Sequence, residues 1–240
     1  GSRSTRVAMG LLKDFTGAIQ SDGYIVYEHF EGMEGKKLLG CWAHARRKFF
    51  EAKVENEKLA LEALSYIRRL YDVEAEADAL DAADNKPDHE RRKALRQEKA
   101  YPEIKKFETW MEASILKCPP KSLMEEAISY TYKILKKLSL YVTDGRYKID
   151  DNMVENSIRP LAIGRKNYLF CGDDDAAQRA AVVYSLLATC KAQEVNPREW
   201  LNYAIARLPY YQGKDSGRDI RELLPDVWKL KKSNENPIEV

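Results

Sequence analysis

Residues 51–141 are a run of nearly continuous helical sequence, and this run most limits what the chain can fold into. Apolar residues recur there at the three- and four-residue spacing of an amphipathic helix. Four of them are Ala60, Leu64, Ile67 and Tyr71. Pro119 and Pro120 interrupt the run because proline cannot continue a helix, and Ser122 starts the next helix with a capping box. We therefore expect a helical segment over 51–141 whose apolar faces are buried together.

Charge is sorted along this segment. Residues 74–90 carry seven acids and one lysine, whereas residues 91–106 carry seven bases and two acids. An antiparallel helical hairpin would place the two blocks side by side, which favours internal ion pairs. The alternative is that the basic block contacts nucleic acid.

Two short β-like segments precede the helical run. Residues 18–21 alternate in polarity and stop at Asp22-Gly23, a turn dipeptide. Residues 38–42 form an apolar run that leads directly into the helical sequence of 43–50. The first 50 residues therefore predict an α/β arrangement in which Asp22 follows a strand.

The sequence after the helical run predicts further helices. The Asp and Asn side chains of residues 150–152 can cap a helix that carries Glu155, and Pro160 is expected to end that helix early. Residues 176–192 and the segment after Asn196-Pro197 predict two more helices.

Composition excludes several classes of protein. Hydrophobic residues make up 44% of the 240 residues and charged residues 32%, which argues against disordered and low-complexity chains. The net charge of +2 is too small to indicate a nucleic-acid binder, so local patches must decide that question. No apolar run is long enough for a membrane helix, and the spacing of the four cysteines predicts neither a zinc nor a disulfide framework.

Asp22 and Glu155 are the most informative pair of acids. One follows a strand and the other lies on a short capped helix, and carboxylates in such places can share a divalent metal ion. Since the chain has 38 acidic residues, a surface or capping role for either one is the alternative from spacing alone.

Two groups of basic residues are candidates for phosphate contacts. Residues 156–172 contain Arg159, Arg165 and Lys166 and no acid, and Gly164 would let a backbone approach closely. The alternative is a solvated loop. His44, Arg46 and Arg47 open the helix after the second strand, and their alternative is the polar face of an amphipathic helix.

Four motifs in order and spacing resemble the catalytic half of insertion-sequence-66 family transposases. They are GAIQSDGY (17–24), GCWAHARRKFFEA (40–52), DGRYKIDDNMVENSIRPLAIGRKNYLFCG (144–172) and AAVVYSLLATCKAQEVNPREWL (180–201). The likeness covers residues 5–211, and residues 221–228 resemble a short C-terminal extension found in some members.

The resemblance implies a ribonuclease-H-like DDE core, in which two aspartates and a glutamate hold two Mg²⁺ or Mn²⁺ ions for DNA strand cleavage and transfer. Asp22 matches the second acid and Glu155 the third. The implied organisation is a partial core over 1–50, a helical insertion over 51–141, completion of the core over 142–211 and a C-terminal extension over 212–240.

The resemblance also implies partners and a location. Insertion-sequence end DNA and target DNA would be bound, with Arg159, Arg165 and Lys166 near the DNA and with His44, Arg46 and Arg47 in the motif around the second strand. Other transposase subunits are expected to form a homo-oligomer with the chain, in the cytoplasm at the nucleoid and without a membrane.

One departure from the family pattern concerns the first aspartate. Nothing in residues 1–21 resembles its motif, and Asp14, the single acid there, lies too close to Asp22 to belong to a separate core strand. We therefore expect a chain that lacks the first aspartate and the early strands and is inactive alone. A milder departure is Asn156, where many members carry arginine.

Two other functions remain open from the sequence. One is a DNA-binding or regulatory transposase remnant that does not cut. The other is a helical protein-interaction module that works through residues 51–141.

Overall fold

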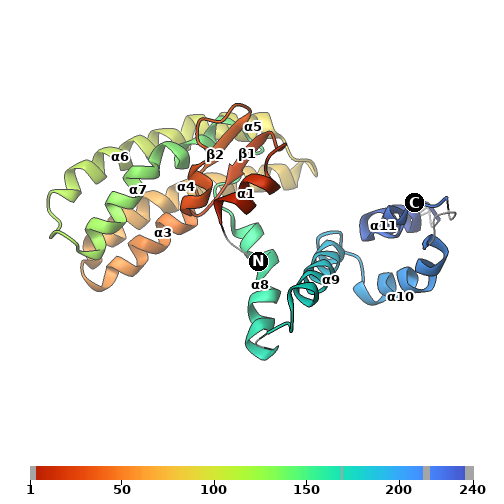
Figure 1. Cartoon of the computed structure of the whole chain (residues 1–240). Coiled ribbons are helices and arrows are strands. Elements are labelled where there is room, and N and C mark those ends of the chain that lie inside the picture. Colours follow the sequence, from red (N-terminus) through yellow and green to blue (C-terminus); the bar gives the residue numbers. More distant parts are fainter. Residues whose placement is uncertain (1–3, 169, 213–216, 236–240) are drawn as a thin grey trace. The chain divides into compact units, whose positions relative to one another are not determined.

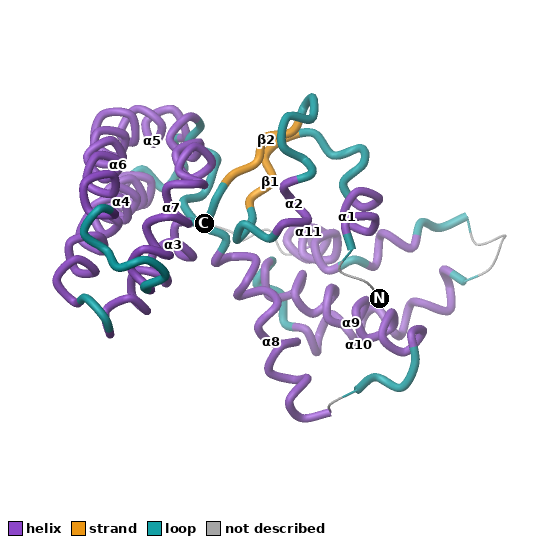
Figure 2. The backbone as a smooth tube through the Cα atoms, turned by 60° about the vertical axis from the view of Figure 1, so that its left-hand side comes forward, coloured by secondary structure: helices purple, strands orange, loops and turns teal. Residues whose placement is uncertain are grey.

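The chain is mostly helical, as the sequence predicts, with one pair of short strands near its start (Figures 1 and 2). The computed structural model describes residues 4–168, 170–212 and 217–235. Its helices and strands are α1 (Thr5–Leu11), β1 (Gly17–Gln20), α2 (Ile25–Glu28), β2 (Lys36–Leu39), α3 (Trp42–Glu51), α4 (Glu57–Ala83), α5 (His89–Leu95), α6 (Tyr101–Ile115), α7 (Leu123–Ser139), α8 (Asn152–Tyr168), α9 (Asp174–Ala192), α10 (Pro197–Arg207) and α11 (Pro225–Glu235). Short 3₁₀ turns cover Ala52–Val54, Leu140–Thr143, Leu208–Tyr211 and Ile220–Leu223, and a π-helical turn, Arg96–Ala100, joins α5 to α6.

The chain forms two compact units, residues 1–155 and 156–240. The first contains the strands and α1 to α7, and it also contains the first turn of α8. The second contains the rest of α8 and all the later helices.

The two strands are parallel, with Gly17 paired to Lys36 and Gln20 to Leu39. Because α2 carries the chain back between them, both strands end at the same edge of the sheet. Ile19 and Leu38 occupy one face and pack on buried Phe30. On the other side Gly40 approaches α7 so closely that a Cβ there would lie 2.9 Å from Leu138. The strand ends are therefore fixed against α7.

The main core lies between four helices. Figure 1 shows α3, α4, α6 and α7 side by side, and these helices contact one another through fully buried Trp42, Phe49, Ile67 and Phe107. The apolar faces predicted over 51–141 are therefore buried together, and α3 contributes to the same core.

The sorted charges of α4 to α6 pair with one another, which confirms the antiparallel interpretation. Arg96 is fully buried, donates to both carboxylate oxygens of Glu74 at 2.6 and 2.7 Å, and also donates to the carbonyl oxygens of Tyr141, Asp144 and Tyr147. Arg91, Arg92, Arg96 and Lys99 make ion pairs with acids of α4, whereas the remaining three bases, Lys93, Lys105 and Lys106, pair with acids of their own helices. Each base of this block therefore has a structural ion-pair partner.

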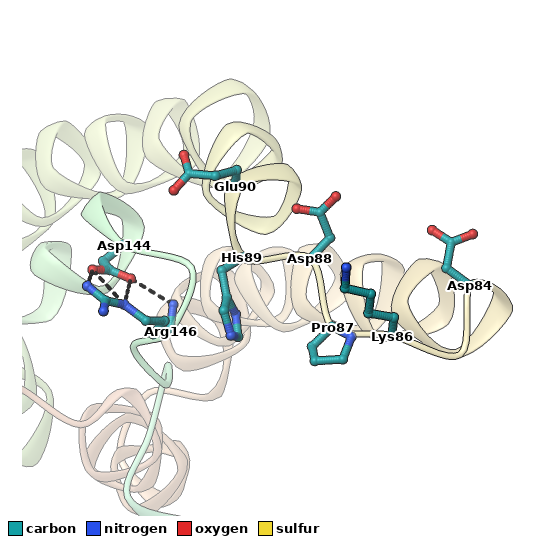
Figure 3. A pocket seen from close by; sticks show the side chains of 8 residues that line it. All are labelled: Asp84, Lys86, Pro87, Asp88, His89, Glu90, Asp144 and Arg146. Carbon is teal, nitrogen blue, oxygen red and sulfur yellow. Dashed lines mark hydrogen bonds and ion pairs between the residues drawn. The ribbon is translucent and has the colours of Figure 1, made fainter.

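Gly145 marks a tight contact between the start of α5 and the loop before α8. His89 and the ion pair of Asp144 with Arg146 line an open pocket of about 680 Å³ together with the turn before α5 (Figure 3). A Cβ on Gly145 would lie 1.9 Å from the carbonyl oxygen of His89, so the backbones could not approach as they do.

Gly145→Ala is therefore expected to destabilise the chain by about 3 kcal/mol, the upper part of the usual range for overpacking. Urea unfolding followed by circular dichroism measures this change. Gly10→Ala is the matched control, because Gly10 lies in α1 with no atom near the added methyl group, and alanine there should be neutral or stabilising by up to about 1 kcal/mol. Equal effects of the two substitutions would contradict the assigned contact.

The second unit has a small core of its own. Cys190, Val195 and Trp200 are buried together, and the Trp200 indole donates to the carbonyl oxygen of Leu223 at 2.8 Å. Asp173 and Asn196 cap α9 and α10, as expected for the two predicted helices.

Candidate active site

The edge where both strands end carries the first candidate acid. Ser21 and Asp22 follow β1 directly, and the Oδ1 atom of Asp22 accepts a hydrogen bond from the Tyr24 backbone N–H at 3.0 Å. The carbonyl oxygen of Asp22 accepts a second bond, at 2.9 Å, from the Tyr130 hydroxyl on α7. The main chain of Asp22 is therefore fixed, while its carboxylate is exposed.

The loop before α8 is attached to the same edge of the sheet. Gln20, the last residue of β1, donates from its side chain to the carbonyl oxygen of Lys148 at 2.9 Å. The first residue of α3, Trp42, donates its backbone N–H to the carbonyl oxygen of Ile149 at 3.1 Å. These two bonds bring the first turn of α8, with Asp151 and Glu155, to the strand ends.

His44 links the two sides of this site. It lies in the first turn of α3, and its Nε2 atom is 3.2 Å from Oε1 of Glu155. Its Nδ1 atom is 3.2 Å from Sγ of Cys41 and 3.7 Å from Oδ1 of Asp151. The Cys41 thiol in turn donates to Oδ1 of Asp151 at 2.9 Å. Sequence reasoning associated His44 with DNA, and the structure places it against a carboxylate.

Tyr130 lies among the same charged groups. Burial, helped by the charges of Asp22, Cys41 and Asp151 and opposed by Arg47, raises the pKa of its hydroxyl to about 12. Asp22, Asp151 and the start of α3 therefore lie close enough to the Tyr130 hydroxyl to act on it electrostatically.

Asp22 and Glu155 do not touch each other within the described part of the chain. Oδ2 of Asp22 and Oε2 of Glu155 make no hydrogen bond or ion pair with any described residue. Hard carboxylate oxygens without a competing partner are the ligands that Mg²⁺ and Mn²⁺ prefer, so the donor chemistry fits such an ion.

The candidate DNA-contacting arginines of α3 are exposed. Arg46 and Arg47 make no ion pair with any described residue. Arg46 lines a groove of about 570 Å³ whose wall also includes Arg68 of α4 and Asn152 at the start of α8. Two cations thus border a groove that reaches the turn bearing Glu155.

The second basic group lies on a helix. Pro160 was predicted to end α8 early, and this is wrong, because α8 continues through Pro160 to Tyr168. Arg159, Arg165 and Lys166 are exposed residues of that helix in the second unit. Gly164 lets Tyr184 of α9 approach, since a Cβ there would lie 2.8 Å from the tyrosine hydroxyl oxygen.

Sequence reasoning missed Cys41 and Asp151. Two signals were present: Cys41 lies three residues before His44, one helical turn away, and Asp151 directly follows Asp150 in a run where only one acid is needed as a cap. Burial, together with the hydrogen bond to Asp151, raises the pKa of the Cys41 thiol to about 12.

A thiol-labelling experiment tests this environment. Iodoacetamide in the presence of a chelator should modify exposed Cys171 at least about 100-fold faster than Cys41, since the thiolate is the reactive form and burial blocks access. Peptide mass spectrometry after timed quenching measures both rates, and the denatured chain should label at both positions. Comparable rates in the folded chain would contradict the buried hydrogen-bonded thiol.

The fold and site together define a mostly helical chain with one pair of parallel strands, in which Asp22 follows the first strand and the loop before α8 is bonded to the end of that strand. Residues 1–179 match the family described as "Transposase IS66 family", and residues 185–225 match the "IS66 C-terminal element". The chain belongs to the IS66 transposase family.

Three proteins of Sinorhizobium fredii (strain NBRC 101917 / NGR234) are similar to the chain. It is 36% identical to "Uncharacterized protein y4qI" over 229 residues, which cover 92% of this chain and 40% of the relative. It is 31% identical to y4hP and to y4jD, each over 235 residues, and covers 41% and 44% of their lengths. The chain thus spans less than half the length of these relatives. No solved structure matches it, and no described helix is long and apolar enough to cross a membrane.

Proposed function

We propose that this chain carries the second and third acids, Asp22 and Glu155, of a DDE transposase active site on a ribonuclease-H-like core. The attachment of the α8 turn to the strand ends carries the proposal: bonds from Gln20 and Trp42 bring a helix-borne glutamate to the edge where Asp22 lies. Family membership supports a transposase-related function.

The proposed organisation follows from this assignment. Residues 1–50 would form part of the core, 51–141 a helical insertion, 142–211 the completion of the core and 212–240 an extension. The parallel pairing of β1 with β2, followed after the helical segment by a glutamate-bearing helix, is compatible with it.

The residues of the site have separate tasks in the proposed reaction. Asp22 and Glu155 would hold Mg²⁺ or Mn²⁺, which when bound lowers the pKa of an attacking hydroxyl and stabilises the leaving oxygen of an in-line displacement. His44 holds one oxygen of Glu155, leaving the other available as a ligand. Tyr130 holds the main chain of Asp22 in place.

DNA is the proposed substrate, and α3 supplies two of the proposed contacts. Arg46 and Arg47 lie one turn from His44, and the groove beside Arg46 can accept a phosphate backbone next to Asn152. Arg159, Arg165 and Lys166 on α8 would add phosphate contacts. We further propose that the protein acts at insertion-sequence ends on the nucleoid, as a homo-oligomer with other transposase subunits.

Salt dependence tests the arginine assignment. Alanine at both Arg46 and Arg47 should weaken DNA binding and reduce the slope of log affinity against log salt by about 1 for each phosphate that the chain no longer neutralises. Fluorescence anisotropy with duplex DNA between about 50 mM and 200 mM salt measures the slope. Lys105→Ala is the control, since Lys105 is paired with Glu108 within α6. An unchanged slope in the double variant would contradict the assignment.

The proposed activity is tested by metal-dependent nicking of end-containing DNA. The chain is assayed alone and fused to the part of y4qI outside the matched region, which is proposed to supply the remaining acid. Activity only in the fusion is the expected result. Failure of both proteins to nick, with DNA still bound in a salt-dependent way, would instead favour a non-catalytic regulatory role.

A further inference from the structure

Three different metal-ligand types converge where α3 meets α8. We propose that Cys41, His44 and Asp151 form a binding site for a zinc-class divalent ion, separate from the carboxylates of Asp22 and Glu155. The Sγ, imidazole nitrogen and carboxylate oxygen atoms of the three residues all lie within 4.8 Å of one another, a spread that a single ion can span.

The backbone holds each donor in place. Cys41 precedes the first turn of α3, and fully buried Trp42 beside it is anchored by its indole N–H to the carbonyl oxygen of Leu138 at 3.0 Å. The carbonyl oxygen of Asp151 accepts the N–H groups of Val154 and Glu155 at the start of α8. The donors therefore come from two helix starts joined by the bond from Trp42 to Ile149.

The side chain of Asp151, the residue before α8, does not cap that helix. A residue before a helix normally caps it with a side-chain oxygen, but here Asp150 accepts the N–H of Asn152 at 3.2 Å and Asp151 turns toward Cys41 instead. The side chains of His44 and Asp151 are each only 12% exposed, and Cys41 is buried. A carboxylate is thus kept out of water beside a thiol and an imidazole.

Glu155 completes the arrangement from the far side of the imidazole ring. Metal-bound histidines commonly donate their other N–H to a carboxylate, which fixes the ring and its tautomer. Nε2 lies 3.2 Å from Oε1 of Glu155, and in the tautomer that carries its proton on Nε2 the lone pair of Nδ1 is free to face Sγ of Cys41 and Oδ1 of Asp151. The thiol hydrogen is then the one proton among three electron-rich atoms.

A metal ion would take the place of that proton. The Cys41 S–H bond breaks, a sulfur–metal bond forms, and one proton is released to solvent for each ion bound. Sulfur and imidazole ligands favour Zn²⁺ over Mg²⁺, and a fourth tetrahedral position stays open to water.

The test uses the chain alone, without DNA, and Co²⁺ as a spectroscopic substitute for Zn²⁺. The chain should bind one Co²⁺ with a sulfur-to-cobalt charge-transfer band and the strong visible bands of tetrahedral coordination, and Zn²⁺ should displace it. Cys41→Ser should abolish the charge-transfer band, and Asp151→Asn should weaken binding at least about 100-fold. Glu155→Gln should weaken metal binding about 10- to 100-fold, as expected for a residue that orients a metal-binding histidine.

Controls keep the outcomes distinct. Cys118→Ser and Cys171→Ser should leave the band intact, and circular dichroism of each variant reports whether it folds. Asp22→Asn should not change Zn²⁺ affinity, so the result for this site is independent of the result for the proposed transposase site. Absence of the band in the unsubstituted chain, or its loss on Cys171→Ser, would overturn the proposal.

Discussion

Replacing Glu155 with glutamine should reduce strand cleavage and transfer by the y4qI fusion at least about 10²- to 10³-fold, the scale seen when one group that stabilises transition-state charge is removed. Glutamine keeps the shape of the side chain, and its amide oxygen can still lie beside Nε2 of His44. The variant therefore removes the negative charge while leaving the fold and the DNA-binding surface in place. Gel assays of nicked and joined products measure the effect.

Glu98→Gln is the matched control for this prediction. Glu98 is an exposed acid of the π-helical turn, away from the strand ends, and its substitution should leave activity unchanged. Asp22→Asn should reproduce the loss caused by Glu155→Gln. Full activity in either acid variant would show that the reaction does not depend on this pair of carboxylates.

Arg96→Met is the substitution expected to affect stability most. Arg96 is fully buried and holds Glu74 together with three carbonyl oxygens of residues 141–147. Removing the guanidinium leaves the buried Glu74 carboxylate with Arg92 as its one ion-pair partner among the described residues, and it takes a donor from each of the three carbonyl groups, which should cost about 3–5 kcal/mol. Urea unfolding of the variant and of the unsubstituted chain gives the difference in the free energy of unfolding.

Two further variants test the cause of the expected loss of stability. Arg68→Met on exposed α4 surface should change stability by less than about 1 kcal/mol, because exposed pairs contribute little. Glu74→Met combined with Arg96→Met should recover part of the loss, since no buried charge is left unpaired. A double variant less stable than Arg96→Met alone would contradict the account.

The sequence predicted the parts of the fold that depend on local pattern. Apolar spacing predicted the helices of 51–141, and the sorted charges predicted that the acids of α4 pair with bases of α5 and of the π-helical turn. Helical composition over 176–192 and the Asn196-Pro197 pair predicted α9 and α10. These features are visible in the sequence itself, as spacing, as blocks of charge or as a capping residue.

The failures come from interactions distant in sequence. Pro160 stays within α8, although proline has no N–H to donate and usually ends a helix. The cluster of Cys41, His44 and Asp151 joins residues up to 110 positions apart, so no local sequence pattern predicts that they meet. The bond from Gln20 to the loop before α8 spans 128 positions and places Glu155 at the strand ends.

Mapping backbone cleavage by bound Fe²⁺ tests the central claim most directly, because hydroxyl radicals formed at the ion cut the chain beside its ligands. Fe²⁺ also binds carboxylate sites that accept Mg²⁺. We predict cuts near Asp22 and near Glu155 in the folded chain, both suppressed by added Mg²⁺ and both lost in Asp22→Asn. Cuts that appear at only one of these two segments, or that Mg²⁺ does not suppress, would contradict the shared site.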